Sequence, residues 1–109
     1  MAKKILAVLK PSANTNTTAY TVPSAKETVV STISICNVSA VSDTARIFVW
    51  QSGGSASTSN AIYYDLAVGV ADSFQATCGI TLAVGDTVTV YSLGGNLTFH
   101  IFGDEGAIT

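Results

Sequence analysis

The side chain best suited to proton transfer in this sequence is its single histidine, His100. Active sites and metal sites combine a histidine with a nucleophile, a carboxylate or a further ligand at short spacing. Around His100 apolar and polar residues simply alternate, and the nearest acidic residues, Asp104 and Glu105, follow in the C-terminal tail. We therefore interpret His100 as a structural or surface histidine.

The other acidic residues do not gather in the sequence. They are Glu27, Asp43, Asp65, Asp72 and Asp86. They fall on separate loops and strand ends, so neither a paired-carboxylate active site nor a calcium-binding loop is predicted. The sequence also contains no phosphate-binding glycine loop and no serine-hydrolase motif. We predict that the protein is not an enzyme and that it uses no metal and no cofactor.

The two cysteines, Cys36 and Cys78, are too few for a disulfide scaffold and too far apart in sequence for a redox or zinc motif. Side-chain parity puts Val29, Ile33 and Ile35 on one face of their strand and Cys36 on the other. Cys78 shares its face with the apolar residues of a later strand. We expect the two thiols in different layers, reduced and not bonded to each other.

Composition narrows the class of protein. The chain has 109 residues, which is the size of one domain, 1–109. Charged residues make up 11% of the chain, against roughly 25% in an average soluble domain. The net charge is −2 and the few cations form no stripe, so nucleic acid is not an expected partner. A charge-poor surface favours association, so we expect a partner protein to cover part of it.

Secretion and membrane insertion are not expected. The apolar run Ile5–Leu9 is shorter than the roughly 7 to 15 residues of a signal peptide's apolar region. No stretch reaches the 18 or so apolar residues that a membrane helix needs. The glycosylation patterns at Asn16, Asn37 and Asn96 are expected to be chance matches in a threonine-rich chain.

Short segments of alternating apolar and polar residues, separated by turn-rich pieces, are typical of a β-sandwich or barrel. We predict an all-β protein, an antiparallel sandwich of about seven or eight strands and of jelly-roll-like or immunoglobulin-like type. The stretch Pro11–Thr18 is expected to be irregular, and Ser52–Asn60 to be a flexible loop because it is rich in serine and glycine. The expected strands are Lys3–Leu9, Glu27–Asn37, Thr44–Gln51, Ala61–Val68, Ser73–Cys78, Ile80–Leu82, Thr87–Leu93 and Leu97–Phe102.

Five aromatic residues fall on the strand faces opposite the better aliphatic sets: Phe48, Trp50, Tyr63, Tyr91 and Phe102. A two-layer sandwich buries only one face of each sheet, so two interpretations stay open. Either the register is misassigned or the rings lie half-exposed, or these residues form a subunit interface, where aromatic residues are enriched. The second interpretation predicts an oligomer of identical chains, and we favour a homotrimer.

An ordered series of short pieces links the chain to a known group of proteins. In the order and spacing of these pieces the chain resembles short virion structural proteins of tailed bacteriophages, including phages of cyanobacteria. The resemblance covers roughly Leu9 to Glu105 and implies a compact β-sandwich on the outside of the particle, with no catalytic residues. The pieces are Tyr20-Thr21-Val22-Pro23, Lys26, Val29–Ile33, Ile35–Ser39, Arg46–Val49, Tyr64-Asp65, Gly79–Leu82, Gly85-Asp86, Val88–Tyr91 and Phe102-Gly103.

Two roles fit this resemblance. The first is a capsid decoration (cement) protein, which binds the major capsid protein or another virion protein and stabilises the assembled head. The alternative is a tail, baseplate or fibre-associated protein that contacts the host surface. Aromatic residues on strands rather than on loops favour decoration. The resemblance places the protein on the outer surface of the virion, after synthesis in the cytoplasm of the bacterial host.

The expected attaching segments are the two ends of the chain. Ile5–Leu9 and Gly103–Thr109 are the candidates, although a terminal strand that completes its own sandwich is the simpler interpretation of Ile5–Leu9. The loop Gln51–Asn60 is rich in serine and glycine, where the resemblance implies more proline and alanine. We therefore assign no attachment role to that loop from the resemblance.

Overall fold

The computed structural model describes residues 2–108. In this range the chain forms eight β-strands and one short 3₁₀ turn, η1 (Thr58–Asn60). The strands are β1 (Ala2–Leu9), β2 (Thr17–Thr21), β3 (Lys26–Asn37), β4 (Asp43–Trp50), β5 (Ala61–Val68), β6 (Ser73–Leu82), β7 (Thr87–Ser92) and β8 (Leu97–Ala107).

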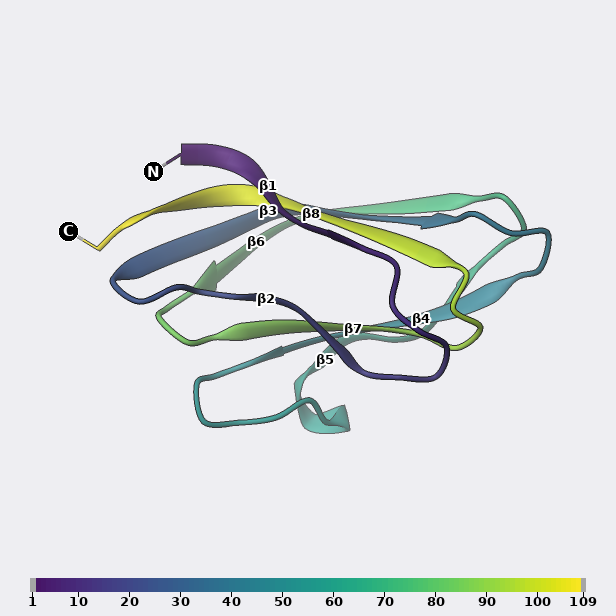
Figure 1. Ribbon diagram of the computed structural model, residues 1–109, viewed down its shortest axis with the longest axis horizontal. Coiled ribbons are helices and arrows are strands. Elements are labelled where there is room, and N and C mark those ends of the chain that lie inside the picture. The colour runs from purple at the N-terminus through teal and green to yellow at the C-terminus, as the bar shows by residue number, and fades with distance from the viewer. Residues whose placement is uncertain (1, 109) are drawn as a thin grey trace.

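The strands form two four-stranded sheets that pack face to face (Figure 1). Sheet A has the strand order β1-β8-β3-β6, and sheet B has the order β2-β7-β4-β5. Neighbouring strands are antiparallel throughout. The predicted all-β sandwich is confirmed, and this interleaved order is that of the jelly roll.

Three strands differ from the prediction by more than one residue at an end. β2 was not predicted: Thr17 and Thr18 fell in the stretch expected to be irregular, and its sequence Thr-Thr-Ala-Tyr-Thr has no clear apolar alternation. β6 runs unbroken through Gly79. β8 continues beyond Phe102, and its last residues pair with both β1 and β3 instead of forming a free tail. The loop before β5 contains η1 and is closed by Asn60, whose side-chain amide donates to the carbonyl oxygen of Ser55 at 2.8 Å.

The core lies between the sheets and comes mainly from their central strands. A central strand has neighbours on both sides, so its inward row of side chains is fully covered. Burying one such aliphatic side chain contributes about 1.5–3 kcal/mol. The fully buried apolar residues are Val30, Ile33, Ile35, Ala45, Ile47, Val88, Val90, Leu97, Phe99 and Ile101.

A bulge explains where side-chain parity failed in β3. The strand carries an extra residue, Ser31, between its pairs with β8. A bulge shifts the alternation of all residues on one side of it. Val30 therefore lies in the core with Ile33 and Ile35, whereas Val29 was expected to share their face.

Gly103 occupies a position in β8 that no larger residue could take. A β-carbon at this residue would collide with the backbone carbonyl oxygen of Val29 and would lie 3.0 Å from the Leu6 side chain. The neighbouring strands therefore approach β8 closely at this point.

The two ends of the sandwich are built differently (Figure 1). Segments 10–16, 38–42, 69–72 and 93–96 connect strands at one end, which we call the loop end. β1 begins and β8 ends at the opposite end, together with the β2–β3 and β6–β7 connections. We call this the terminal end. The β4–β5 connection with η1 lies beneath sheet B in Figure 1.

Candidate interaction surfaces

The outer face of sheet B carries a cluster of aromatic side chains around one arginine, which we call the aromatic face. Arg46, Phe48 and Trp50 come from β4, Tyr91 from β7 and Tyr64 from β5. Phe48 and Tyr91 are only 3% and 5% exposed, although they lie on the outer face, whereas Tyr64 is 50% exposed. Phe48 and Tyr91 are thus buried within one chain, whereas Tyr64 remains available for contact with a partner.

Arg46 is held between two tyrosine rings. Its guanidinium carbon lies 4.2 Å from the ring centre of Tyr64 and 4.5 Å from that of Tyr91. Its Nε donates to Asp65 Oδ1 at 2.6 Å, and this hydrogen bond raises the pKa of the guanidinium. A cation over an aromatic face is attracted by the ring quadrupole. The arginine is therefore charged and fixed in place before any partner arrives.

Further hydrogen bonds fix the rings themselves. The indole Nε1 of Trp50 donates to Thr89 Oγ1 at 2.9 Å. The hydroxyl of Tyr91 donates to Asn14 Oδ1 at 2.6 Å. Side chains that are already ordered lose little conformational entropy when they are buried in an interface.

The structure brings together three of the five aromatic residues that were expected at an interface. Phe48, Trp50 and Tyr91 share the aromatic face. Tyr63 points between the sheets, where its ring packs edge-to-face on Phe74 with centroids 5.5 Å apart. Phe102 lies on the outer face of sheet A. The five residues therefore do not form one surface.

The placement of Tyr63 follows from a bulge that the sequence did not reveal. Arg46 of β4 faces two residues of β5, Tyr64 and Asp65, and Asp65 has a left-handed φ of 55°. Two successive side chains, instead of one, thus stay on the outer face. Tyr63 consequently belongs to the inward row, with Leu66.

The outer face of sheet A carries a smaller apolar group at the β1 edge. Phe102 pairs with Ile5 and His100 pairs with Val8, and both aliphatic side chains are exposed. The His100 and Phe102 rings stack with centroids 5.9 Å apart. His100 thus lies on the surface of a sheet, between Val8 and Ser34 on the neighbouring strands.

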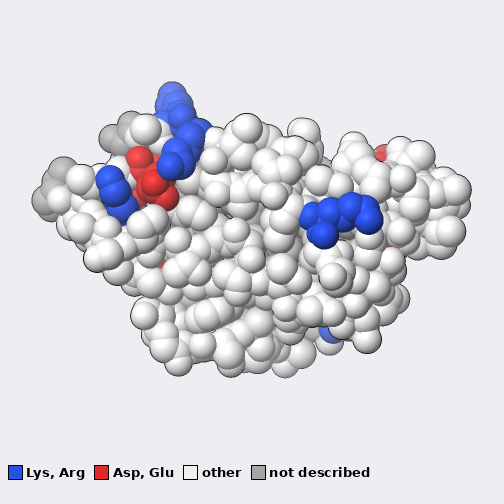
Figure 2. All heavy atoms as spheres, in the orientation of Figure 1, with Lys and Arg blue, Asp and Glu red and all other residues white. Residues whose placement is uncertain are grey.

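The loop end presents exposed aliphatic side chains on three adjacent loops. Val38, Val41, Val70 and Leu93 are between 52% and 64% exposed. Backbone hydrogen bonds join these loops, from Val38 N to the carbonyl oxygen of Asn96 at 3.0 Å and from Ala71 N to that of Ser39 at 3.3 Å. On the face visible in Figure 2, charged side chains gather mainly over the terminal end. The loop end is therefore the more apolar end on this view.

A buried asparagine holds two of these loops. The side-chain nitrogen of Asn37 donates to the carbonyl oxygens of Val41 at 2.8 Å and Val68 at 3.2 Å. Its Oδ1 accepts from the backbone nitrogen of Ser39 at 3.0 Å. Asn37 is 2% exposed, so the glycosylation pattern around it has a structural explanation.

A buried aspartate, Asp43, holds the β7–β8 loop. Its carboxylate accepts from Ser92 Oγ at 2.7 Å and from the backbone nitrogens of Thr44 at 2.7 Å, Gly94 at 2.7 Å and Asn96 at 3.0 Å. Burial alone would raise the pKa of this carboxyl, but these four hydrogen bonds outweigh burial and lower it. From the sequence, Asp43 was expected to be one of several scattered carboxylates and the Asn37 pattern a chance match, whereas both residues fix the shape of the apolar loops.

The cysteines lie in one sheet, not in different layers. Cys36 is on the outer face of β3, and Cys78 on β6 packs against the core. Side-chain parity predicts which face of its own strand each cysteine occupies. It could not show that both strands belong to sheet A. Both thiols are free, and burial raises the pKa of Cys78, so little of it is present as the reactive thiolate.

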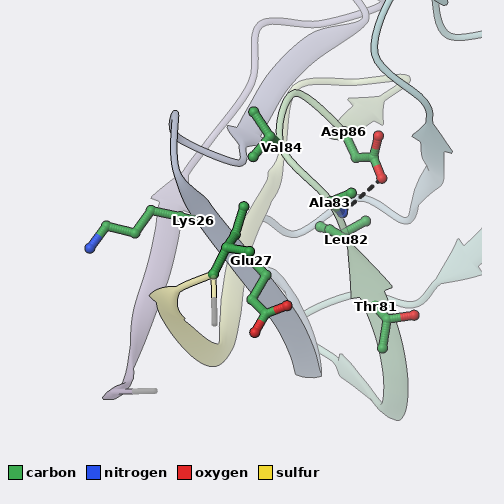
Figure 3. A pocket seen from close by; sticks show the side chains of 8 residues that line it. Lys26, Glu27, Thr81, Leu82, Ala83, Val84 and Asp86 are labelled. Carbon is green, nitrogen blue, oxygen red and sulfur yellow. Dashed lines mark hydrogen bonds between the residues drawn. The ribbon is translucent and has the colours of Figure 1, made fainter.

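A hollow lies at the terminal end, between the start of β3 and the β6–β7 connection. It has a volume of about 420 Å³ and is lined mainly by apolar groups such as Leu82 and Val84. In Figure 3 the Lys26 side chain points away from the other residues, and Asp86 accepts a hydrogen bond from the backbone nitrogen of Ala83 at 2.9 Å. In residues 2–108 no three His, Cys, Asp or Glu side chains are placed to hold a metal ion.

Comparisons with protein-family models, with curated proteins and with solved structures found no match to this chain. None of the helices in the described part of the chain is long and apolar enough to cross a membrane.

Proposed function

We propose that the chain is a structural protein of a bacteriophage virion, of the kind that decorates an assembled capsid and stabilises it. The jelly roll is used by viral capsid proteins, but also by lectins and cupins. The fold alone therefore does not decide the role, which has to be argued from the surfaces.

The observation that carries this proposal is the apolar loop end. Its exposed aliphatic side chains are held by loops that are bonded through Asn37 and Asp43. An apolar patch on a rigid support suits permanent contact with another protein, because little ordering is needed on binding. We assign this end to the contact with the major capsid protein or another virion protein.

The aromatic face supports an oligomer of identical chains. Tryptophan, tyrosine and arginine are the residue types that dominate interface energetics, and Trp50, Tyr64 and Arg46 lie together there. A homotrimer built through this face would carry several loop ends to the shell. Each bound copy would favour the assembled shell over separated subunits by mass action.

The test uses phage particles that lack this protein. Adding back the wild-type protein should raise the temperature at which heating releases the genome. Adding Val41→Asp should not, because a charge at the loop end would be buried against the shell. The matched control is Val84→Asp, which places the same charge on an exposed valine at the terminal end. An unchanged release temperature at full occupancy of the wild-type protein would reject cementing.

One observation favours the alternative, a tail, baseplate or fibre protein that contacts the host. A hollow of about 440 Å³ lies beside Trp50 and is lined by uncharged polar residues, among them Gln51, Ser55 and Asn60. Uncharged polar groups beside an aromatic ring suit a neutral polar ligand. Loss of host adsorption in the particles that lack the protein, with normal heat stability, would support this second role.

A further inference from the structure

The sandwich has four edge strands, and three of them carry features that hinder pairing with another chain. The edge strands are β1 and β6 in sheet A and β2 and β5 in sheet B. β1 carries Lys3 and Lys4 and a bulge. β2 has only five residues and a register shift, and β5 carries Asp65 and two register shifts. Charges, bulges and short length are the usual protection of sheet edges.

The fourth edge, β6, has little such protection. It is ten residues long, Ser73–Leu82, and contains no charged residue and no proline. Its two-residue irregularity, Cys78-Gly79, lies opposite Ser31 on the β3 side. One side of β6 pairs with β3, and its other side has no neighbouring strand among residues 2–108. The backbone N–H and C=O groups on that side form a template for an added strand.

The side chains of β6 also suit an added strand. The outward row is Gln75, Thr77 and Thr81, which are exposed. The inward row includes Phe74 and Ile80, which are only half-buried because sheet A ends at this strand. A further strand would cover these two apolar side chains and continue the core.

We propose that β6 pairs in antiparallel fashion with β6 of a second copy of this chain, so that two copies of sheet A become one continuous sheet. In antiparallel two-fold pairing, residue i of one strand lies beside residue j of the other and j beside i, so only the residue at the axis faces its own copy. β6 contains no charged residue, so no register of this pairing brings like charges together. Pairing of β1 with β1 around Lys3 and Lys4 would bring lysines of both copies together. A second copy of this chain is therefore the partner that suits the β6 edge.

This contact is separate from the surfaces discussed above. β6 lies in sheet A, whereas the aromatic face lies on the outside of sheet B, and the proposed shell contact lies on loops. The proposal therefore does not depend on the proposed function. It also does not exclude a trimer built through the aromatic face, since one chain can use both contacts.

The first experiment uses cysteine cross-linking. In a Cys36→Ala, Cys78→Ala background, single cysteines replace Gln75, Thr77 or Thr81, and each purified protein is oxidised and run on a non-reducing gel. We expect efficient disulfide dimers at one of these positions, the one nearest the two-fold axis. The matched control is Ala67→Cys on the edge strand β5, which is also exposed and should not cross-link. Cross-linking that is no faster at any β6 position than at Ala67 would overturn the proposal.

The second experiment keeps both native cysteines, so it does not depend on that background folding. Sedimentation at micromolar concentration should show wild-type protein associating, and Thr77→Lys should dissociate this contact because a lysine in the middle of an edge strand hinders its pairing in any register. Thr77→Ser is the matched control and should associate as wild type does. Thr77→Lys that keeps the wild-type sedimentation and the wild-type Tm would contradict pairing through β6, as would a monomeric wild-type protein.

Discussion

Two carboxylates at opposite ends of the sandwich hold it together in different ways. Asp43, at the loop end, is buried and accepts hydrogen bonds from uncharged donors. Glu105, at the terminal end, accepts from the hydroxyl of Tyr20 and from Lys4 Nζ at 2.9 Å. Tyr20 belongs to sheet B and Glu105 to sheet A. Asp43 therefore shapes a loop, whereas Glu105 connects the two layers.

The pKa of both carboxyls is lowered, but for different reasons. Hydrogen bonds outweigh burial at Asp43. At Glu105 the hydrogen bond from Tyr20 is the main cause and that from Lys4 comes second. Lys4 is 48% exposed, so salt screens its charge, whereas a carboxylate bonded to neutral donors inside the protein is screened much less. The loop end should thus keep its shape over a wide range of salt, and the terminal end should respond to it.

The largest effect is expected for Asp43→Asn. The Asp43 carboxylate accepts all of its hydrogen bonds, whereas the asparagine amide would place its own N–H groups against some of the same donors. The buried hydrogen bonds to a charged acceptor would therefore be lost. We expect the free energy of unfolding to fall by about 2–3 kcal/mol, which lowers Tm by roughly 10 °C or more. The control is Asp72→Asn, an exposed aspartate at the same end. Urea unfolding measures the free energy of unfolding of each variant. Equal losses in the two variants would show that Asp43 contributes no more stability than an exposed aspartate does.

Acid should destabilise the wild type in two overlapping steps. A carboxyl with a lowered pKa in the folded state contributes stability above its ordinary pKa, which is 3.8 for Asp43 and 4.5 for Glu105. That stability is lost as pH falls through the lower folded value. Urea unfolding from pH 6 down to pH 2, a range of roughly four units, should give a shallower loss for Asp43→Asn than for the wild type. Parallel curves would contradict the assignment.

Tyr20→Phe is expected to cost about 1–2 kcal/mol, since it removes the two hydrogen bonds that the hydroxyl makes to sheet A and leaves the ring. The Tyr20 hydroxyl also lies 2.8 Å from Thr28 Oγ1. Burial and then the bond to Glu105 raise the pKa of Tyr20 to about 12. A raised pKa contributes stability below the ordinary value of 10.0, and this is lost as pH rises towards 12.

The measurement for Tyr20 is the loss of stability between neutral and alkaline pH. It should be smaller in Tyr20→Phe than in the wild type, by urea unfolding at each pH. Tyr64→Phe is the matched control, because that ring is half-exposed, and it should follow the wild-type curve. If Tyr64→Phe had the larger effect, the link between the sheets would not be at Tyr20.

The smallest effect is expected for Lys4→Met. Exposed ion pairs contribute only about 0.2–1 kcal/mol, so the free energy of unfolding should fall by a few tenths at low salt. About 1 M NaCl should remove this difference, because the Debye length is then only about 3 Å. The effect of Asp43→Asn should persist at the same salt concentration. A salt-independent effect of Lys4→Met would mean that the side chain acts through packing.

The sequence predicted the class of fold because apolar alternation is a local property of each strand. Most strands were located by it, and β2 was missed because its five residues lack a clear pattern. The faces of Val30 and Tyr63 could not be predicted, because a bulge depends on how a strand pairs with its neighbours. Strand order is likewise set by contacts between distant segments.

The polar residues of the loop end left a weak signal that could have been used. Asn37 continues the inward row of Ile33 and Ile35, so it is a polar residue at a core position. Asp43 stands at the start of a strand and reaches a Gly-Gly-Asn turn 51 to 53 residues later. The buried position of Asn37 could be predicted from side-chain parity. The role of Asp43 could not, because it depends on which loops meet in the folded chain.

The arrangement of the chain ends has a practical consequence for engineering. β1 begins and β8 ends at the terminal end, where Ala2 pairs with Glu105, on the opposite side of the molecule from the loop end (Figure 1). A peptide or a second protein fused through a linker to either end would extend away from the loop end. If the loop end binds the shell, such fusions would be carried outward on the particle surface, which suits the chain as a platform for displaying cargo.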